Sequence, residues 1–217
     1  MSSFIIKICG ITSPEDAQVA VEAGATAIGL NFYPKSPRYI GLDRAREIAA
    51  AVPAHILKVG VFVNLPTVLH SKWGGRTPAL GASPVSAASF PAGVLDILQL
   101  HGSASPVPGY RVWRACSAHN LPQPDPAIEA YLLDSPSPKF GGSGQPFDWR
   151  LAAKFPHRML IAGGLDASNV AAAIQAAAPW GVDACSRLES SPGKKDPARV
   201  RDFVQAALAA FRQPITL

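Results

Sequence analysis

Short apolar runs alternate along much of this chain with segments whose apolar residues recur at helical spacing. The runs predict eight strands, at residues 4–8, 26–31, 56–63, 95–100, 111–115, 130–134, 159–162 and 182–185. The segments between them predict helices at about residues 14–23, 42–52, 148–155, 168–178 and 196–211. Strands that alternate with helices are typical of βαβ units and a parallel sheet. We therefore expect one α/β domain over residues 1–217.

The first predicted strand is followed directly by a cysteine and then by residues that favour the start of a helix. Cys9 and Gly10 follow the apolar run directly, and Ser13 and Pro14 favour a helix N-terminus. Cys9 is therefore predicted at the carboxyl end of a buried strand, where parallel α/β proteins bind ligands. A free cysteine at such a place is also common as a small buried hydrophobe, and from this strand alone that interpretation stays open.

Two stretches in the middle of the chain break the alternation. Residues 65–94 have no apolar period and are rich in Gly, Ala, Ser and Pro, so we expect an irregular connection between the third and fourth strands. Only about ten residues separate the strands at 95–100 and 111–115, fewer than a parallel crossover with a helix needs. We predict that the helix between these two strands is missing.

The composition and charge of the chain indicate which kinds of molecule it binds. Of the 217 residues, 48% are hydrophobic and 16% charged, which suits strands covered on both faces. The net charge of +5 is scattered, which favours a small anionic molecule over nucleic acid. Cys9, Cys116 and Cys185 lack metal-ligand spacing, so we expect no metal site and reduced thiols in a cytoplasmic protein. Without a visible signal peptide or long apolar run, no membrane contact is expected.

If the strands close into a barrel, their carboxyl ends share one rim, and active sites of such barrels lie there. The rim would hold a thiol, a carboxylate and two turns rich in Gly or Ser, at Cys9, Asp134, Gly163, Gly164 and Ser186. A thiolate base facing a carboxylic acid suits enolisation and ring opening of a sugar. The glycine turn before a helix offers backbone N–H groups to a phosphate. Arg38, in a loop constrained by proline, could bind a carboxylate in two places.

Several of these features also have plain structural interpretations. The Gly163–Gly164 pair could be an ordinary tight turn between strand and helix. His101 is interpreted as a structural, hydrogen-bonded histidine, and Cys116 as packing. Lys35 and the Lys194–Lys195 pair are expected to be solvated charges, the usual state of exposed lysines.

A set of short motifs, in a fixed order, resembles one family. The motifs are KICGIT (7–12), FYPKSPRY (32–39), VGVFVN (59–64), QLHG (99–102), LLD (132–134), FDW (147–149), AGGL (162–165) and ESSPG (189–193). In these the chain is similar to the phosphoribosylanthranilate isomerases of tryptophan biosynthesis. The resemblance implies a single (β/α)8 TIM barrel that performs an Amadori rearrangement of N-(5′-phosphoribosyl)anthranilate without a cofactor. The barrel would act as a monomer or a homodimer.

The resemblance also implies roles for individual residues. Asp134 would protonate the furanose ring oxygen, and Cys9 would remove the C2′ proton. Arg38 would hold the anthranilate carboxylate. The phosphate would be bound by backbone N–H groups of Gly164 and Ser186, in the turns that also contain Gly163 and Arg187.

The turn after the eighth strand departs from the family pattern, which reads Asp-Val-Ser-Ser-Gly-Val-Glu. Here Arg187 stands at the glycine, where a side chain would either strain the backbone or push the anion outward. This departure supports an alternative, a degenerate barrel that binds a phosphorylated ligand with little turnover. A second alternative is the related isomerase of the histidine pathway, but that enzyme uses an aspartate on the first strand, where this chain has Cys9.

Overall fold

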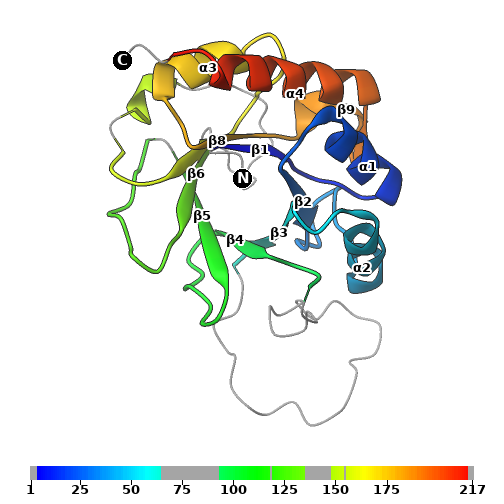
Figure 1. The fold of residues 1–217 in the computed structure, drawn as a ribbon. Coiled ribbons are helices and arrows are strands. Elements are labelled where there is room, and N and C mark those ends of the chain that lie inside the picture. The colour runs from blue at the N-terminus through cyan, green and yellow to red at the C-terminus, as the bar shows by residue number, and fades with distance from the viewer. Residues whose placement is uncertain (1–3, 65–92, 118, 135–147, 154, 215–217) are drawn as a thin grey trace.

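The computed structural model describes residues 4–64, 93–117, 119–134, 148–153 and 155–214. Eight strands form one closed parallel barrel in chain order (Figure 1). They are β1 (Ile5–Ile8), β2 (Ala27–Asn31), β3 (Leu57–Val63), β4 (Ile97–His101), β5 (Arg111–Ser117), β6 (Ala130–Asp134), β7 (Met159–Ile161) and β8 (Gly181–Ala184). The barrel closes where β1 pairs with β8, with Ile8 opposite Ala184. The predicted α/β barrel is confirmed, whereas the irregular connection predicted at 65–94 lies almost wholly outside the described residues.

Apolar side chains fill both faces of the strands. One buried cluster lies inside the barrel and includes Ile5, Val59, Ile97 and Trp113. A larger cluster lies between the outer face of the strands and the helices. Successive side chains of a strand alternate between its two faces. Every second residue after a member of the inner cluster therefore also points into the barrel.

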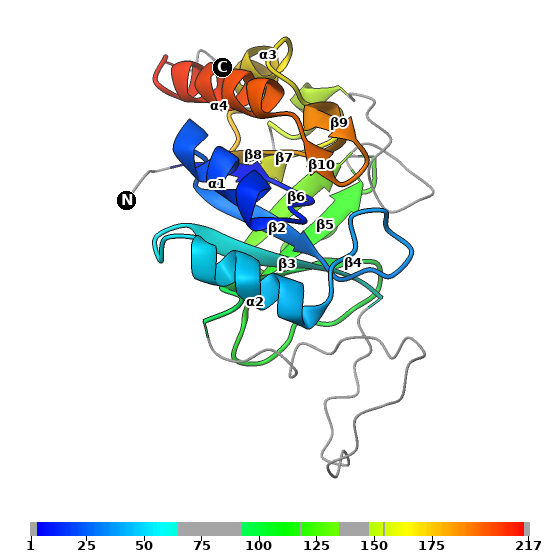
Figure 2. The same cartoon turned by 90° about the vertical axis from the view of Figure 1, so that its right-hand side faces the viewer.

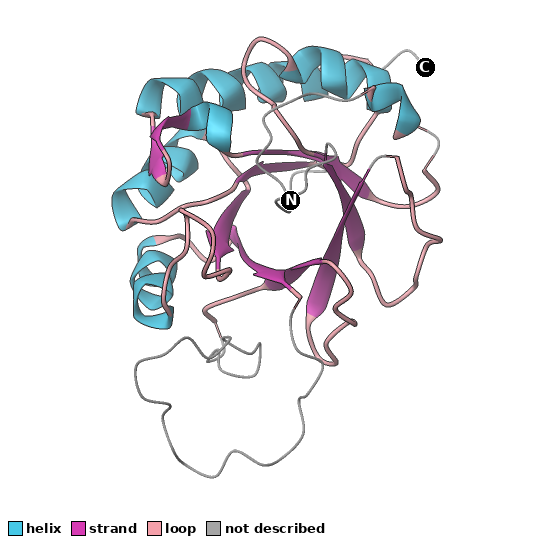
Figure 3. Cartoon of the chain, turned by 180° about the vertical axis from the view of Figure 1, so that it is seen from behind, coloured by secondary structure: helices cyan, strands magenta, loops and turns pink. Residues whose placement is uncertain are grey.

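In the described part of the chain, four α-helices cover part of the barrel wall. They are α1 (Pro14–Ala23), α2 (Leu42–Ala51), α3 (Val170–Ala177) and α4 (Pro197–Phe211). α1 begins as predicted, because the Ser13 side chain accepts a hydrogen bond from Asp16 N at 3.2 Å. α4 packs against α1 and α3. Figures 1 and 3 show the helices outside β8, β1 and β2, whereas loops border the wall at β5 and β6.

The segment between β4 and β5 is described throughout and contains no helix, as predicted. Ala104 and Val107 are buried there, so an extended chain covers the wall with two small apolar side chains. The helix predicted at 148–155 is wrong: only a 3-10 turn forms, η2 (Trp149–Leu151), capped by Asp148. Pro156 explains the difference, because a proline disfavours helical backbone at the residue before it.

After β8 the chain forms a 3-10 turn, η3 (Ser186–Leu188), and then a hairpin of β9 (Glu189–Ser191) and β10 (Lys194–Lys195). Figure 2 shows this hairpin on the same side of the barrel as the loop that follows β2. The hairpin contacts its surroundings through Gly193, whose carbonyl accepts a hydrogen bond from the Thr12 hydroxyl. Within the described part of the chain, no helix is long and apolar enough to cross a membrane.

Candidate active site

The barrel interior is polar toward the carboxyl ends of the strands. On β1, Lys7 follows Ile5 on the inner face, and Cys9 comes next at the carboxyl end of the strand. On β8, Asp183 lies opposite Lys7 and is followed by Cys185. Lys7 is fully buried, and its Nζ lies 2.8 Å from Oδ1 of Asp183. The Lys7–Asp183 ion pair therefore lies inside the barrel two residues before Cys9 and Cys185 along β1 and β8.

Cys9 is buried at the end of β1, and its backbone N–H donates to Ala184 O at 2.9 Å. A hydrogen bond from the Cys185 thiol lowers the pKa of Cys9 well below its ordinary value, and the Lys7 ammonium adds to this against the opposing effect of burial. The same contact raises the pKa of Cys185. Gly29 makes room for this group: a methyl group on it would lie 2.8 Å from Sγ of Cys9 and 3.0 Å from Nζ of Lys7. These contacts favour the thiolate form of Cys9 over the thiol.

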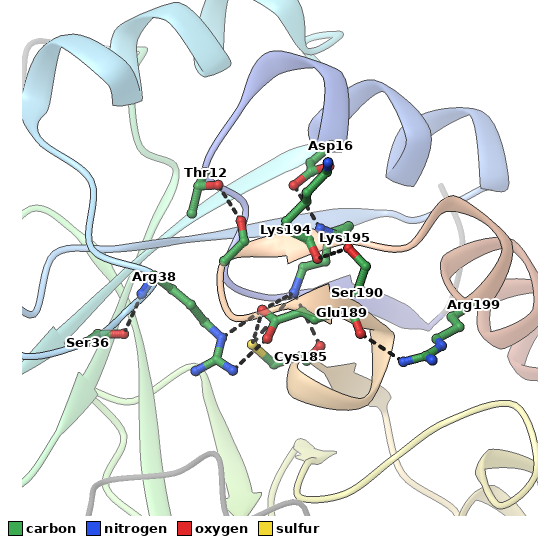
Figure 4. Close-up of polar contacts among 11 residues, drawn as sticks. Thr12, Asp16, Ser36, Arg38, Cys185, Glu189, Ser190, Lys194, Lys195 and Arg199 are labelled. Atoms are coloured by element: carbon green, nitrogen blue, oxygen red, sulfur yellow. Dashed lines mark hydrogen bonds and ion pairs between the residues drawn. The ribbon is translucent and has the colours of Figure 1, made fainter.

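A second buried ion network lies next to the thiols (Figure 4). Arg38 donates from Nε and Nη2 to the two carboxylate oxygens of Glu189, both at 2.7 Å. Lys195 lies on the other side of Glu189, with its Nζ 3.0 Å from Oε1. Lys195 also lies 3.8 Å from Sγ of Cys185 and donates to the Cys185 carbonyl at 3.3 Å. Glu189 therefore joins the Arg38 loop to the thiol end of β8.

The expectation that Lys195 is a solvated charge is wrong, because its side chain is 0% exposed. Its neighbour Lys194 is exposed, as is Lys35. The difference follows from the β9–β10 hairpin, which turns one lysine inward to Glu189 and leaves the other in water. A charged side chain this deeply buried is retained only with a partner, and Glu189 is that partner.

The charges of the two networks do not cancel. Lys7, Arg38 and Lys195 carry three positive charges, and Glu189 and Asp183 supply at most two negative ones. Burial raises the pKa of Asp183 to about 7, although Lys7 opposes this, so part of that negative charge is absent at neutral pH. Cys9 therefore lies beside an excess of positive charge, which favours a negative charge on its sulfur.

A pocket opens at the rim next to Asp183 and Cys185. It is lined by Asp134, Ala162, Gly163, Gly164, Leu165, Asp183, Cys185, Ser186 and Arg187. Asp134 ends β6, and both glycines of the turn after β7 have left-handed backbone, at φ +83° and +65°. Asn169 holds this turn by donating from Nδ2 to Gly164 O at 2.8 Å. The structure thus brings the predicted acid and the predicted phosphate turns into one pocket with Cys185.

Arg187 occupies the 3-10 turn after β8. Its Nη1 donates to Oδ2 of Asp166 at 2.7 Å, which ties the turns after β7 and β8 together. Among the described residues, the non-glycine positions with positive φ are Asn64 and Ala178. The backbone strain expected at Arg187 is therefore absent, because a 3-10 turn accepts any ordinary residue there.

The remaining candidates differ in their surroundings. His101 Nε2 lies 2.9 Å from Nε2 of Gln99, and burial lowers the pKa of His101 to about 4, while the charges of Cys9 and Lys7 also act on it. Cys116 packs against the outer cluster, on the other face of the sheet from Cys9, and burial raises its pKa to about 12. The position of Cys116 agrees with its interpretation as packing, whereas His101 faces the charged end of the barrel interior.

Comparison of this chain with known protein families identifies the family to which the barrel belongs. A sequence model of the N-(5′-phosphoribosyl)anthranilate (PRA) isomerases matches residues 6–69 and 91–206.

The chain belongs to the PRA isomerase family.

Relatives of known sequence and structure agree with this assignment. The N-(5′-phosphoribosyl)anthranilate isomerase of Solibacter usitatus is 47% identical over 216 residues, which cover 95% of this chain and 98% of the relative. The crystal structure of the PRA isomerase from Thermotoga maritima matches with a TM-score of 0.77 at 33% identity, covering 95% and 99% of the two chains. A PRA isomerase in complex with reduced 1-(o-carboxyphenylamino)-1-deoxyribulose 5-phosphate matches with a TM-score of 0.73 at 30% identity and the same coverage.

Three charged residues of this PRA isomerase family member were not singled out from the sequence: Lys7, Asp183 and Glu189. Lys7 and Asp183 had a readable signal, because each is an ionisable residue inside a strand whose neighbours are apolar. Such a residue must be paired when the strand is buried on both faces. For Glu189, the sequence carried no comparable signal beyond its place in the ESSPG motif.

Proposed function

We propose that this chain catalyses the Amadori rearrangement of N-(5′-phosphoribosyl)anthranilate, with Cys9 as the base and Asp134 as the acid. The observation that carries the proposal is the surroundings of Cys9, a buried thiol beside an excess of positive charge in a member of this family. A thiolate is a base in place before substrate arrives. It needs no metal or cofactor to remove a proton next to an iminium carbon.

The chemistry proceeds in two proton transfers. Asp134 protonates the furanose ring oxygen, the C1′–O bond breaks, and the anilino nitrogen supplies the electron pair that forms the iminium ion. Cys9 then takes the proton from C2′, and the electrons of that C–H bond form the C1′–C2′ double bond while the nitrogen recovers its pair. The resulting enol rearranges to the ketone of 1-(2-carboxyphenylamino)-1-deoxyribulose 5-phosphate. Proton transfers of this kind contribute about 10²–10⁴-fold each.

The remaining proposed contacts orient the substrate. Backbone N–H groups in the turns at Gly163, Gly164 and Ser186 hold the phosphate, and Arg187 borders the same pocket. Arg38 holds the anthranilate carboxylate. A guanidinium has five N–H donors and Glu189 takes two of them, so Arg38 has donors left for a ligand carboxylate while Glu189 fixes its orientation.

The alternative of a degenerate barrel loses the part of its support that came from backbone strain at Arg187, because the turn there is an ordinary 3-10 turn. Its other support, the irregular middle third of the chain, lies partly outside the described residues. The proposed enzyme acts in the cytoplasm on a small phosphosugar, as a monomer or a homodimer, and analytical ultracentrifugation distinguishes the two.

The test of the proposal is direct. Substrate made from anthranilate and phosphoribosyl pyrophosphate is mixed with the protein, and the loss of substrate fluorescence is followed with a chelator present. Cys9→Ser should lower kcat by at least about 10²-fold, because a serine hydroxyl is not ionised at neutral pH. The matched control is Cys116→Ser, which changes a thiol on the outer face of the sheet. Wild-type turnover by folded Cys9→Ser would refute the role of Cys9, and no turnover by the wild type would refute the function.

A further inference from the structure

Cys9 and Cys185 lie side by side where the barrel closes. The register of β1 on β8 pairs Lys7 with Asp183 and Ile8 with Ala184, and Cys9 N bonds to Ala184 O at 2.9 Å, so the next pair is Cys9 with Cys185. Neighbouring strands lie about 4.8 Å apart, within the Cα separation of about 4.4–6.8 Å that a disulfide requires. We propose that Cys9 and Cys185 form an oxidisable dithiol, a modification site at which a hydroperoxide converts the two thiols into a disulfide.

Both side chains point to the same place. The residues two positions earlier, Lys7 and Asp183, bond to each other across the same pair of strands inside the barrel at 2.8 Å. Because side chains repeat every second residue along a strand, Cys9 and Cys185 share that inner face. The contact between the two thiols is also the largest influence on the pKa of each, lowering that of Cys9 and raising that of Cys185.

The surroundings of the two thiols favour Cys9 as the one that reacts with the oxidant and Cys185 as the one that forms the disulfide with it. The thiolate character of Cys9 suits attack on a peroxide, since the thiolate is the nucleophile. Cys185 lines the pocket, which gives a small oxidant a route to the pair, and Lys195 lies 3.8 Å from its sulfur (Figure 4). A reactive cysteine with a second thiol alongside is the arrangement that favours a disulfide over further oxidation.

The reaction balances with one equivalent of hydrogen peroxide. The Cys9 thiolate attacks one peroxide oxygen, the O–O bond breaks, and Cys9 becomes a sulfenic acid while hydroxide leaves. Cys185 then attacks the Cys9 sulfur, forming the S–S bond and breaking the S–O bond. The departing hydroxide takes the proton of the Cys185 thiol as water. The two sulfurs give up two electrons, and the peroxide becomes one molecule of water and the hydroxide released in the first step, which takes a proton from solvent.

Disulfide formation does not depend on the proposed function, whereas the accompanying loss of turnover does, because it consumes the proposed base. Reduced full-length protein is treated with one equivalent of hydrogen peroxide, blocked with N-ethylmaleimide and mapped by mass spectrometry. We expect a peptide pair linked through Cys9 and Cys185, with Cys116 blocked. Turnover should fall in proportion to the linked pair and return with dithiothreitol.

Two variants make the outcome specific. Cys116→Ser should give the same linked pair as the wild type. Cys185→Ser should give no linked pair, and instead a Cys9 sulfenic acid that dimedone traps. The proposal is overturned if the wild type, like Cys185→Ser, accumulates sulfenic or sulfinic acid on Cys9 while Cys185 remains blocked. It is also overturned if peroxide leaves both thiols unchanged, or if the disulfide joins two chains. A linked pair without loss of turnover would uphold the modification site and refute the role of Cys9 as base.

Discussion

Replacing Lys7 with methionine tests whether buried charge holds Cys9 as a thiolate. The Nζ of Lys7 and the Sγ of Cys9 lie 3.0 Å and 2.8 Å from the same point above Gly29, and so at most about 6 Å apart. With an effective dielectric constant of about 20, a unit charge at about 6 Å contributes roughly 3 kcal/mol, which is about two pKa units. Lys7→Met should therefore raise the pKa of Cys9 by about two units or more.

The assay is the pH dependence of iodoacetamide reaction at Cys9, read from the Cys9 peptide, beside the pH profile of kcat/KM. The acid limb of the profile should move to higher pH by the same amount as the thiol pKa, because only the thiolate can take the proton. Turnover lost at neutral pH should then return as the pH is raised. Asp183 does not offset the effect, since its carboxyl becomes protonated once its partner is gone.

Lys58→Met is the matched control. Lys58 is also a buried lysine, and its Nζ lies 2.9 Å from Oδ2 of Asp96, but it points to the outer face of β3. Each variant breaks a buried pair and should lower stability by about 3–5 kcal/mol, which thermal unfolding measures. If Lys7→Met unfolds, Lys7→Met with Asp183→Asn removes both charged groups, and the pKa shift of Cys9 should be about the same, because Asp183 is already neutral in the single variant. Equal Cys9 pKa values in Lys7→Met and Lys58→Met would refute the reasoning.

Three further substitutions test the other proposed contacts by steady-state kinetics. Asp134→Asn keeps the shape of the side chain but removes the acid, so kcat should fall by about 10²–10⁴-fold, and an unchanged kcat would assign the acid role elsewhere. Arg38→Met should raise KM more than it lowers kcat, by up to about 3 kcal/mol in binding, because a charge-assisted contact to the carboxylate is lost. A fall confined to kcat would contradict that role. Arg187→Gly should leave KM the same or lower it, since its pair with Asp166 is partly exposed, and such pairs contribute about 0–1 kcal/mol. A KM more than about tenfold higher would show that Arg187 itself holds the phosphate.

Local sequence signals predicted the parts of the fold that depend on neighbouring residues. The apolar runs placed all eight strands, because a strand buried on both faces must be apolar along its length. Ser13 and Pro14 marked the start of α1, and Gly163–Gly164 marked the turn after β7. The prediction of a helix at 148–155 was wrong. It used the apolar pattern alone and did not consider that Pro156 disfavours helical backbone at the residue before it.

The sequence alone determined the strand order, the barrel and the place of Cys9 and Asp134 at strand ends, since these follow from short-range periodicity and from resemblance in local motifs. Only the tertiary structure decided which charges meet. Lys7 and Asp183 are 176 positions apart and Arg38 and Glu189 are 151 apart, and neither pair shares a local pattern. Barrel closure brings β1 against β8, and the hairpin after β8 buries Lys195. The electrostatics of Cys9 are therefore a property of the closed barrel, because burial and long-range pairing set them and the residues adjacent in sequence do not.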